Sequence, residues 1–339
     1  MAANLRDVAR RAGVSVPTAS RVLSGADYRV SDDLRARVER AARELDYVPN
    51  AQAQALLQGN AGTVGVLAGD VRDPYFSEII NGVHAAATVR KLLVTICNTD
   101  RDVARELEYF RLLQAHRTGI VIIAGSELDD ETYKRGMAAR SRSFQNSGGR
   151  VIAVGNPFLE ADHVLVDNVA GGRALGEHLV ALGHREIGVV AGDAKVLSTV
   201  DRIAGLREAL EGAGGVVHVR YGSASREGGY AGAQELLKDH PGSTAIVGSA
   251  DQMAIGALTF LRHAGRTVPG DISIAGFNDI AGCEDVVPAL TSVRLPLTEM
   301  GAIALELATT PAPPDKPLVR ELSTELIVRE STGPAATGR

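Results

Sequence analysis

Residues 16–21 place hydroxyl groups and one guanidinium group on the outward face of a short predicted helix. Ala19, Val22 and Leu23 recur at helical spacing and form the inward stripe, so the remaining positions face solvent. The outward residues are Val16, Pro17, Thr18, Ser20 and Arg21. An exposed arginine on a helix can donate two hydrogen bonds to a guanine edge or clamp a phosphate, and hydroxyl groups also hold phosphates. These residue types predict DNA contacts, with Arg21 as the main one; the alternative for Arg21 is a solvated surface side chain.

The neighbouring residues supply the elements that would position this helix. Apolar residues recur at helical spacing over residues 5–12, which predicts a first short helix. Gly13 can take the left-handed conformation that ends it. Ser15 can cap the second helix, and Pro17 is tolerated in its first turn because the N–H that proline lacks would be unpaired there. Ser31 can cap a third helix. Two short helices around a glycine turn predict a helix-turn-helix.

Composition and charge fit a small DNA-reading domain on a larger acidic body. The chain has 339 residues, more than one core normally supports, and its apolar (45%) and charged (23%) fractions are ordinary for a soluble globular protein. Residues 1–59 contain nine arginines and seven acidic residues, so this segment carries +2 of a total net charge of −5 and the rest carries −7. Charged residues near the N-terminus argue against a signal peptide, and no run of about 18 apolar residues follows. We therefore expect a cytoplasmic protein without a membrane partner.

From Thr63 onward, short apolar strands alternate with helical stretches. One series covers residues 64–68, 92–96, 119–123 and 151–154, and a second covers residues 186–190, 216–219, 244–247 and 272–275. Continuous apolar strands between helices are typical of parallel sheets covered on both faces. The sequence therefore predicts an α/β fold with two lobes of doubly wound parallel sheets. Ligands of such sheets bind beyond the carboxyl ends of the strands, which predicts a site between the lobes.

Three segments carry a resemblance to a known family: Asp7-Val-Ala9, Ala12-Gly-Val-Ser15 and Thr18-Ala-Ser-Arg-Val-Leu23. They resemble the DNA-binding headpiece of the lactose-repressor (LacI/GalR) family, and the likeness extends to about Ser331. It implies a periplasmic-binding-protein-like core that closes around a small molecule. The implied divisions are a headpiece (1–47), a hinge helix and linker (48–60), a core (61–331) with an N-lobe (61–159 and 291–320) and a C-lobe (160–290 and 321–331), and a tail (332–339).

The segment from Pro49 to Gly59 is uncharged and rich in helix formers, but it is too short to be a stable helix alone. It is either a linker or, as the resemblance implies, a hinge helix that orders in the DNA minor groove beside its copy. Leu56 would then wedge into the central base step, with Asn50 and Ala53 as groove-facing neighbours.

The resemblance also indicates how the operator is bound. Val16 and Pro17 match the positions by which the family chooses among operators, and both are apolar, so they can read only DNA shape or a thymine methyl. The implied operator is a palindrome with a central C–G step. The tail lacks the leucine heptads of a tetramer, so we expect a homodimer.

The predicted effector contacts follow strand ends. Pro74 turns the chain and leaves Tyr75 and Phe76 at a helix start, where their rings either stack on a ligand or simply pack the helix. Arg202 matches the family's effector-clamping arginine in an Arg-x-Ala-Gly pattern; the alternative is a structural ion pair. Asp251 fits a helix cap equally well. The predicted effector-binding residues are Asp73, Tyr75, Phe76, Asn98, Asp100, Asn156, Arg202, Asp251 and Asn278.

Several positions depart from the family pattern. Relatives usually carry an aspartate at Gly155, an asparagine at Ala250, an acidic residue at Asn278 and, in several cases, an aromatic residue at Ala224. These departures leave the ligand open. The family and the combination of Tyr75, Phe76 and Arg202 favour a sugar or sugar derivative.

Catalysis finds no support in the sequence. Neither a Gly-x-Ser-x-Gly elbow nor a Gly-x-x-x-x-Gly-Lys-Ser/Thr loop occurs, no metal-ligand spacing is found, and no cofactor is expected. Cys97 and Cys283 are expected as small buried apolar residues. The sequence thus predicts a transcriptional regulator, most simply a repressor, and not an enzyme. The alternatives are a regulator with a vestigial pocket and a small-molecule binder without gene control; residues 1–59 argue against the latter.

Overall fold

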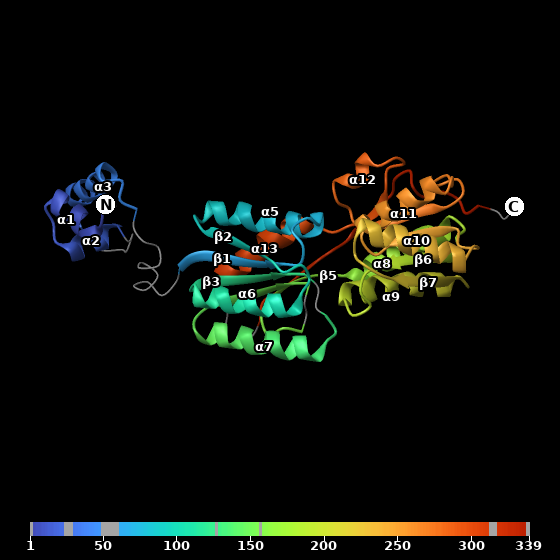
Figure 1. Cartoon of the computed structure of the whole chain (residues 1–339), viewed down its shortest axis with the longest axis horizontal. Coiled ribbons are helices and arrows are strands. Elements are labelled where there is room, and N and C mark those ends of the chain that lie inside the picture. Colours follow the sequence, from blue (N-terminus) through green and yellow to red (C-terminus); the bar gives the residue numbers. More distant parts are fainter. Residues whose placement is uncertain are drawn as a thin grey trace.

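The computed structural model describes residues 3–23, 30–48, 61–125, 128–155, 158–311 and 317–336. The chain forms a three-helix headpiece and two α/β lobes that lie side by side (Figure 1). The sequence predicts the headpiece and both lobes.

The headpiece consists of α1 (Leu5–Ala12), α2 (Val16–Leu23) and α3 (Asp32–Glu44). Asn4 and Asp7 form a capping box at the start of α1, and Gly13 ends that helix at φ +66°. The Ser15 Oγ accepts a hydrogen bond from the Thr18 N–H at 3.3 Å, and Ser31 caps α3. The shared core of the three helices contains Val8, Ala9, Ala12, Ala19, Val22, Val38, Ala41 and Ala42. The predicted helix-turn-helix is therefore present.

The N-lobe has a six-stranded, fully parallel sheet in the order β11-β5-β4-β3-β1-β2. Its strands are β1 (Ala61–Ala68), β2 (Leu93–Asn98), β3 (Thr118–Ala124), β4 (Arg150–Val154), β5 (Asp162–Val166) and β11 (Val319–Leu322). Helices α5 (Pro74–Val89) and α13 (Leu297–Thr309) cover one face, and α6 (Val103–Ala115) and α7 (Glu131–Asn146) cover the other (Figure 1). Because both faces are covered, the central strands are apolar without alternation.

The C-lobe sheet has the order β12-β10-β9-β8-β6-β7, and only β12 is antiparallel to its neighbour. Its strands are β6 (Glu186–Ala191), β7 (Val216–Tyr221), β8 (Ala245–Gly248), β9 (Ser273–Asn278), β10 (Thr291–Arg294) and β12 (Glu325–Ile327). Helices α8 (Asn168–Ala181) and α9 (Leu197–Gly212) pack on one face, and α10 (Arg226–Asp239) and α11 (Asp251–His263) pack on the other. The short α12 (Gly282–Asp285) follows β9.

The chain passes between the lobes after β5, between β10 and α13, and between β11 and β12. The first two passages correct the predicted boundaries. Strand β5 belongs to the N-lobe sheet, whereas the resemblance implies that residues 160–290 lie in the C-lobe. Strand β10 belongs to the C-lobe sheet, whereas the resemblance implies that residues 291–320 lie in the N-lobe.

Polar residues at the starts of β5 and β10 explain why the predicted lobe boundaries differ from the observed ones. The buried Asp162 of β5 accepts a hydrogen bond from the Leu318 N–H at 2.8 Å. The buried Ser292 of β10 donates to Asp251 at 2.6 Å. Such partners are distant in sequence, so the strands look like polar connections until the sheet forms.

The segment that the resemblance assigns to a tail, from residue 332, packs on the C-lobe next to Ser331. Ser331 is fully buried and donates to the Ile274 carbonyl at 2.6 Å. The Gly333 carbonyl lies 3.1 Å from the His184 Nε2, and the Ala335 N–H donates to the Leu182 carbonyl at 2.8 Å. The C-lobe therefore continues through Ala335. Among the described helices, none combines the length and apolar character needed to cross a bilayer.

Candidate DNA interface and effector site

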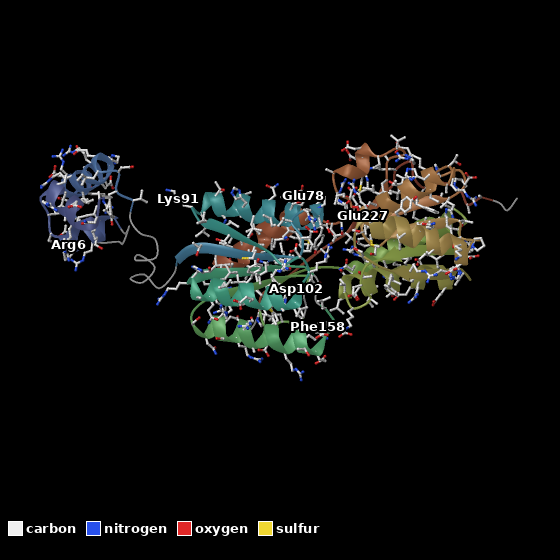
Figure 2. All side chains as sticks on the ribbon, viewed as in Figure 1. Arg6, Glu78, Lys91, Asp102, Phe158 and Glu227 are labelled. Atoms are coloured by element: carbon white, nitrogen blue, oxygen red, sulfur yellow. The ribbon has the colours of Figure 1, made fainter. Side chains whose placement is uncertain are left out.

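Helix α2 presents the predicted DNA-contacting residues on the surface of the headpiece. Ser15, Val16, Pro17 and Arg21 are exposed, while Thr18 and Ser20 are half-buried. The Ser15 Oγ lies 2.7 Å from the Thr18 hydroxyl oxygen and also accepts the hydrogen bond from the Thr18 N–H, so Ser15 acts as a helix cap. Arg6 of α1 is also exposed on the headpiece (Figure 2). The arrangement leaves an outward face with apolar, hydroxyl and guanidinium groups that fits a DNA groove.

Four predicted residues lie outside the part of the chain that the structure describes. Asn50, Ala53 and Leu56 fall in the expected hinge, and Asn156 falls after β4. Their roles stay predictions.

The loop after β1 holds Asp73, Tyr75 and Phe76. Asp73 caps α5 by accepting a hydrogen bond from the Tyr75 N–H at 3.1 Å, and it pairs with Arg101 at 2.8 Å. Phe76 is only 7% exposed, and a Cβ atom at Gly69 would lie 2.6 Å from its ring. Phe76 therefore packs the helix start, which is the alternative that the sequence left open.

Tyr75 is half-buried and packs edge-to-face on Phe76, with ring centres 5.0 Å apart. Burial raises the pKa of its hydroxyl, while the positive charge of Arg202 in the other lobe acts in the opposite direction. Tyr75 and Arg202 thus lie close enough, from opposite lobes, for the charge of one to influence the other.

The residues at the end of β2 bind one another and the loop after β1. Asn98 accepts a hydrogen bond from the Val71 N–H at 3.0 Å and donates to Asp100 at 2.8 Å. Asp100 has φ +51° and pairs with Arg105. Both predicted residues therefore shape the loops at the strand ends.

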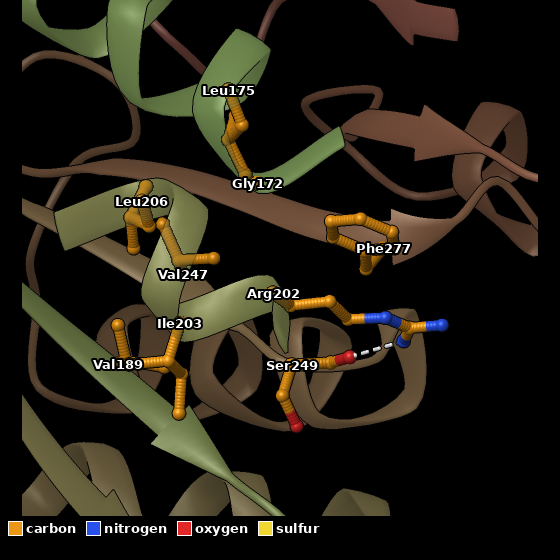
Figure 3. Close-up of a pocket in the computed structure, with 9 residues that line it drawn as sticks. All are labelled: Gly172, Leu175, Val189, Arg202, Ile203, Leu206, Val247, Ser249 and Phe277. Carbon is orange, nitrogen blue, oxygen red and sulfur yellow. Dashed lines mark hydrogen bonds between the residues drawn. The ribbon is translucent and has the colours of Figure 1, made fainter. Parts of the chain in front are cut away.

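Arg202 of α9 is the central charged group of the C-lobe side. The neighbouring elements bury it, so that the residue is only 8% exposed. Its Nε donates to Asn168 at 2.9 Å, and Nη1 donates to the Ser249 carbonyl at 2.7 Å (Figure 3). The guanidinium carbon lies 4.1 Å from the centre of the Phe277 ring.

The electrostatics of Arg202 follow from these neutral partners. Burial lowers the pKa of its guanidinium to about 10, so the group stays charged at neutral pH. No ion pair links it to a carboxylate among the described residues, which argues against the alternative of a structural ion pair. A cavity of about 10 Å³, the size of about one water molecule, lies beside its aliphatic stem and is lined mostly by apolar residues.

Asp251 does not cap α11 as the sequence suggested, because Ala250 holds the N-cap position without a side-chain bond. Asp251 is fully buried and accepts hydrogen bonds from the Ser292 hydroxyl (2.6 Å) and the Ile280 N–H (3.0 Å). Burial raises the pKa of its carboxyl to about 7. The carboxyl therefore joins α11 to β10 and to the loop after β9.

Asn278 ends β9 in an unusual backbone conformation. Its φ is +113°, it is 4% exposed, and its Oδ1 has no hydrogen-bond partner among the described residues. A buried amide oxygen without a partner is rare and costly. Asn278 is thus a polar group at a strand end with capacity to bind a further donor.

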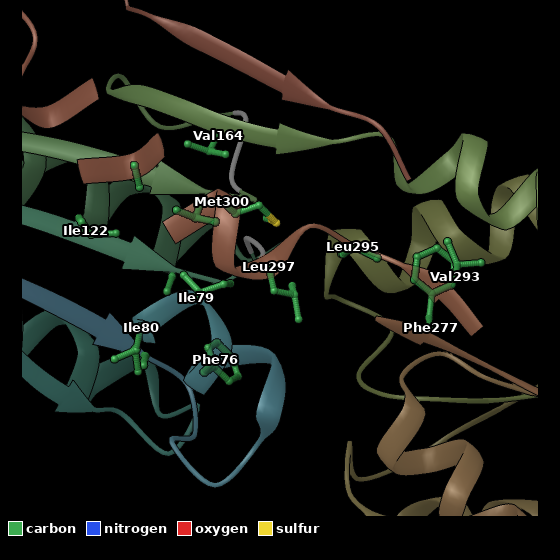
Figure 4. Packing of buried hydrophobic residues seen from close by; sticks show 14 of the residues in the cluster. Phe76, Ile79, Ile80, Ile122, Val164, Phe277, Val293, Leu295, Leu297 and Met300 are labelled. Carbon is green, nitrogen blue, oxygen red and sulfur yellow. The ribbon is translucent and has the colours of Figure 1, made fainter. Parts of the chain in front are cut away.

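Loops from both lobes meet at these strand ends. Arg101 Nη1 donates to the Ala224 carbonyl at 3.4 Å, and the Asp129 N–H donates to the Lys195 carbonyl at 2.7 Å. Figure 4 shows Phe76 and Leu297 on one side and Phe277 on the other. Of the predicted effector-binding residues, those in the loop after β1, Arg202 and Asn278 lie at this meeting point of the two lobes.

Sequence reasoning missed Arg101, Asn168, Ser249 and Phe277. Asn168 and Ser249 closely follow the ends of β5 and β8. The rule that ligand sites form beyond the carboxyl ends of strands could therefore have pointed to both residues, had both strands been predicted. The apolar pattern of the sequence does not predict strand β5, so this rule does not lead to Asn168.

The chain combines a helix-turn-helix headpiece with two α/β lobes whose polar strand ends face each other. This combination is typical of DNA-binding proteins that carry a ligand-binding core. Residues 4–50 match the family described as "Bacterial regulatory proteins, lacI family", and residues 177–332 match the "Periplasmic binding protein-like domain". The chain belongs to the LacI family of bacterial regulatory proteins, as the sequence predicts.

Three relatives illustrate the likeness. The HTH-type transcriptional regulator DegA of Bacillus subtilis is 32% identical over 99% of this chain and 100% of its own length. The structure of the regulator CelR with cellobiose is 30% identical, with a TM-score of 0.69 over 97% of this chain and 99% of that one. The structure of the Lac repressor dimer with operator and the anti-inducer ONPF is 26% identical, with a TM-score of 0.83 over 98% of this chain and 100% of that one.

Proposed function

We propose that this chain is a repressor that binds a palindromic operator as a homodimer and acts in the cytoplasm without catalysing a reaction. Helix α2 would enter the major groove, with Arg21 on a guanine edge and Ser15, Thr18 and Ser20 near phosphates. The observation that carries this proposal is the outward face of α2 on a headpiece with its own core. The operator-bound Lac repressor dimer, which this chain resembles over almost its full length, supports it.

The hinge completes the DNA contact in this proposal. Leu56 would wedge into the central base step, with Asn50 and Ala53 facing the minor groove, as the family resemblance implies. Val16 and Pro17 would read DNA shape or a thymine methyl.

A sugar or sugar derivative between the lobes would control DNA binding. Arg202 offers its Nη2 group, which has no hydrogen-bond partner among the described residues, and Asn278 offers its unpaired Oδ1. Tyr75 offers a half-buried ring from the opposite lobe. In this proposal Asp73, Asn98, Asp100 and Asp251 position the loops around the ligand. The cellobiose complex of CelR supports a carbohydrate.

Control by the effector requires unequal binding to two arrangements of the lobes. A ligand held by Arg202 in one lobe and Tyr75 in the other favours the arrangement in which both reach it. If that arrangement disfavours paired hinge segments, the ligand releases the operator; if it favours them, the ligand strengthens binding.

Two linked measurements test this function. An operator is first selected from random DNA with the full-length protein, and its affinity is measured by fluorescence anisotropy. Mono- and disaccharides, sugar phosphates and nucleosides are then screened by thermal shift, and each ligand that raises the Tm is added to the DNA-binding assay. We expect at least one sugar-type ligand to raise the Tm and to change operator affinity.

Arg202→Gln is the matching variant, with Arg207→Gln on the exposed face of the same helix as its control. The first should lose the ligand-induced shift and the second should keep it. Failure to select any operator contradicts the proposed function.

A regulator with a vestigial pocket is the second candidate. The burial of Phe76, which packs its ring against the helix start and leaves little of it for a ligand, favours it. Selection of an operator without any ligand response would support this candidate over effector control.

A further inference from the structure

Three side chains of the C-lobe converge away from the inter-lobe region. Glu186 begins β6, His218 lies on the edge strand β7, and His240 follows the last residue of α10. One ligand atom from each residue lies within 4.8 Å of the other two. All three residues are half-buried, so solvent can reach them.

The sheet register and the covering helix explain the convergence. His218 pairs with Gly188, two residues after Glu186, so both side chains point to the same face of the sheet. Helix α10 covers that face, because Leu236 occupies the space where Gly188 would carry a Cβ atom. The end of α10 therefore delivers His240 to the same place.

We propose that Glu186, His218 and His240 form a binding site for a divalent transition-metal ion, with Zn²⁺ as the best fit. Two imidazole nitrogens and one carboxylate oxygen are a zinc ligand set, and a water can take the fourth position. The Nε2 of His218 already lies 3.3 Å from Glu186 Oε1. Only glycine at position 242 leaves room for the carboxylate, since a Cβ atom there would lie 2.6 Å from Glu186 Oε2.

The local electrostatics favour a cation. His240 lies at the carboxyl end of α10, where the helix dipole is negative. Glu235 and Asp239 of α10 flank Arg220 of β7, so together with Glu186 these residues carry three carboxylates and one guanidinium group. A bound ion would fasten the edge strand β7 to α10.

Metal binding requires a small rearrangement of the two imidazoles. Their rings are stacked, with centres 3.6 Å apart and planes 7° from parallel. A metal–nitrogen bond lies in the plane of its ring, so parallel stacked rings cannot both bind one ion. One ring, most simply that of His240 beyond the helix end, turns about its Cβ–Cγ bond.

The test is a titration of the full-length protein with ZnCl₂ after treatment with EDTA and dialysis. Calorimetry should give one site for the wild type, and His218→Ala, His240→Ala and Glu186→Gln should each weaken binding by about tenfold or more. His84→Ala, which removes an exposed histidine of α5, should leave the affinity unchanged. Zn²⁺ should raise the Tm of the wild type and not that of the His218→Ala/His240→Ala double variant.

Circular dichroism of each metal-free variant checks that the fold is intact. Co²⁺ in place of Zn²⁺ should give the visible absorption of a four-coordinate ion in the wild type only. Equal Zn²⁺ affinity in the wild type and the double variant, or no Zn²⁺ binding by the wild type, overturns the proposal.

Discussion

Arg202 keeps a positive charge in a place from which water is largely excluded. Its partners are an amide oxygen, a backbone carbonyl and an aromatic face, and none of these carries a full negative charge. A buried cation held in this way is costly unless further acceptors reach it. A ligand rich in hydroxyl groups, or one that carries an anionic group, would supply them.

Arg21→Ala should reduce specific operator binding by roughly 1–3 kcal/mol and relax one base position, because a bidentate contact to guanine is lost. Arg40→Ala on α3 removes the same charge from an exposed headpiece position and serves as the control. Fluorescence anisotropy on the selected operator and on single-base variants measures both effects. An operator affinity equal to that of the wild type would remove Arg21 from the interface.

Asp251 should make stability depend on pH. Burial raises the pKa of its carboxyl from 3.8 to about 7 in the folded protein, so the native state holds this proton where the unfolded chain has released it. The free energy of unfolding should therefore fall as pH rises from about 4 to about 7, because the native state binds more protons over that range. Glu106, whose pKa is also raised to about 7 by burial, adds to the same trend.

Urea unfolding at a series of pH values checks this prediction. Asp251→Asn should flatten the decline, whereas Asp285→Asn, at an exposed position of α12, should keep it. An unchanged decline in Asp251→Asn would contradict the role of this carboxyl.

At the scale of elements, the close approach of α8 and α9 positions Arg202. Gly172 of α8 lies against the backbone of Arg202, and a Cβ atom there would come within 2.2 Å of the Arg202 carbonyl oxygen. Gly205 of α9 makes the reciprocal contact with Val169, at 1.9 Å. Backbones this close bring Asn168, the first residue of α8, within hydrogen-bond distance of Arg202.

Gly172→Ala should push α9 away from α8, and the variant should be less stable by about 1–3 kcal/mol and bind effector more weakly. Gly212→Ala, at the end of α9, is the matched control, because a Cβ atom there would meet no other atom within 4 Å. It should be neutral or slightly stabilising, because alanine favours the helix. Urea unfolding and ligand-induced Tm shifts measure both variants; equal behaviour of the two would contradict the packing argument.

At the scale of the whole molecule, the two sheets leave edge strands on the surface. Strand β2 is one such edge, and it exposes Leu93 (67%) on one face and Ile96 (48%) on the other. An apolar edge strand is a ready surface for pairing with another chain. If the proposed homodimer pairs through this edge, a charge placed on it should disrupt the dimer.

Leu93→Asp should convert the dimer to a monomer of 35.5 kDa, because it places a charge in an apolar interface. Val319→Asp, on the opposite edge strand β11 of the same sheet, is the control and should leave the dimer intact. Light scattering coupled to size-exclusion chromatography gives the masses. A dimeric Leu93→Asp variant would place the interface elsewhere.

The sequence by itself determined the three-helix headpiece, the two series of apolar strands and the family. These features depend on local signals: caps at Ser15 and Ser31, the glycine turn at Gly13, and strands apolar enough to be buried on both faces. The family resemblance also pointed to Arg202 before any contact was known.

Only the tertiary structure decided where the lobes divide and which polar residues meet. Asp162, Ser292 and Ser331 look like loop or tail residues until their distant hydrogen-bond partners are in place. Likewise Glu186, His218 and His240 share no motif spacing and come together only through the register of β6 and β7 and the length of α10. The physical reason is that burying a polar group is favourable only with a partner, and the fold alone brings distant partners together.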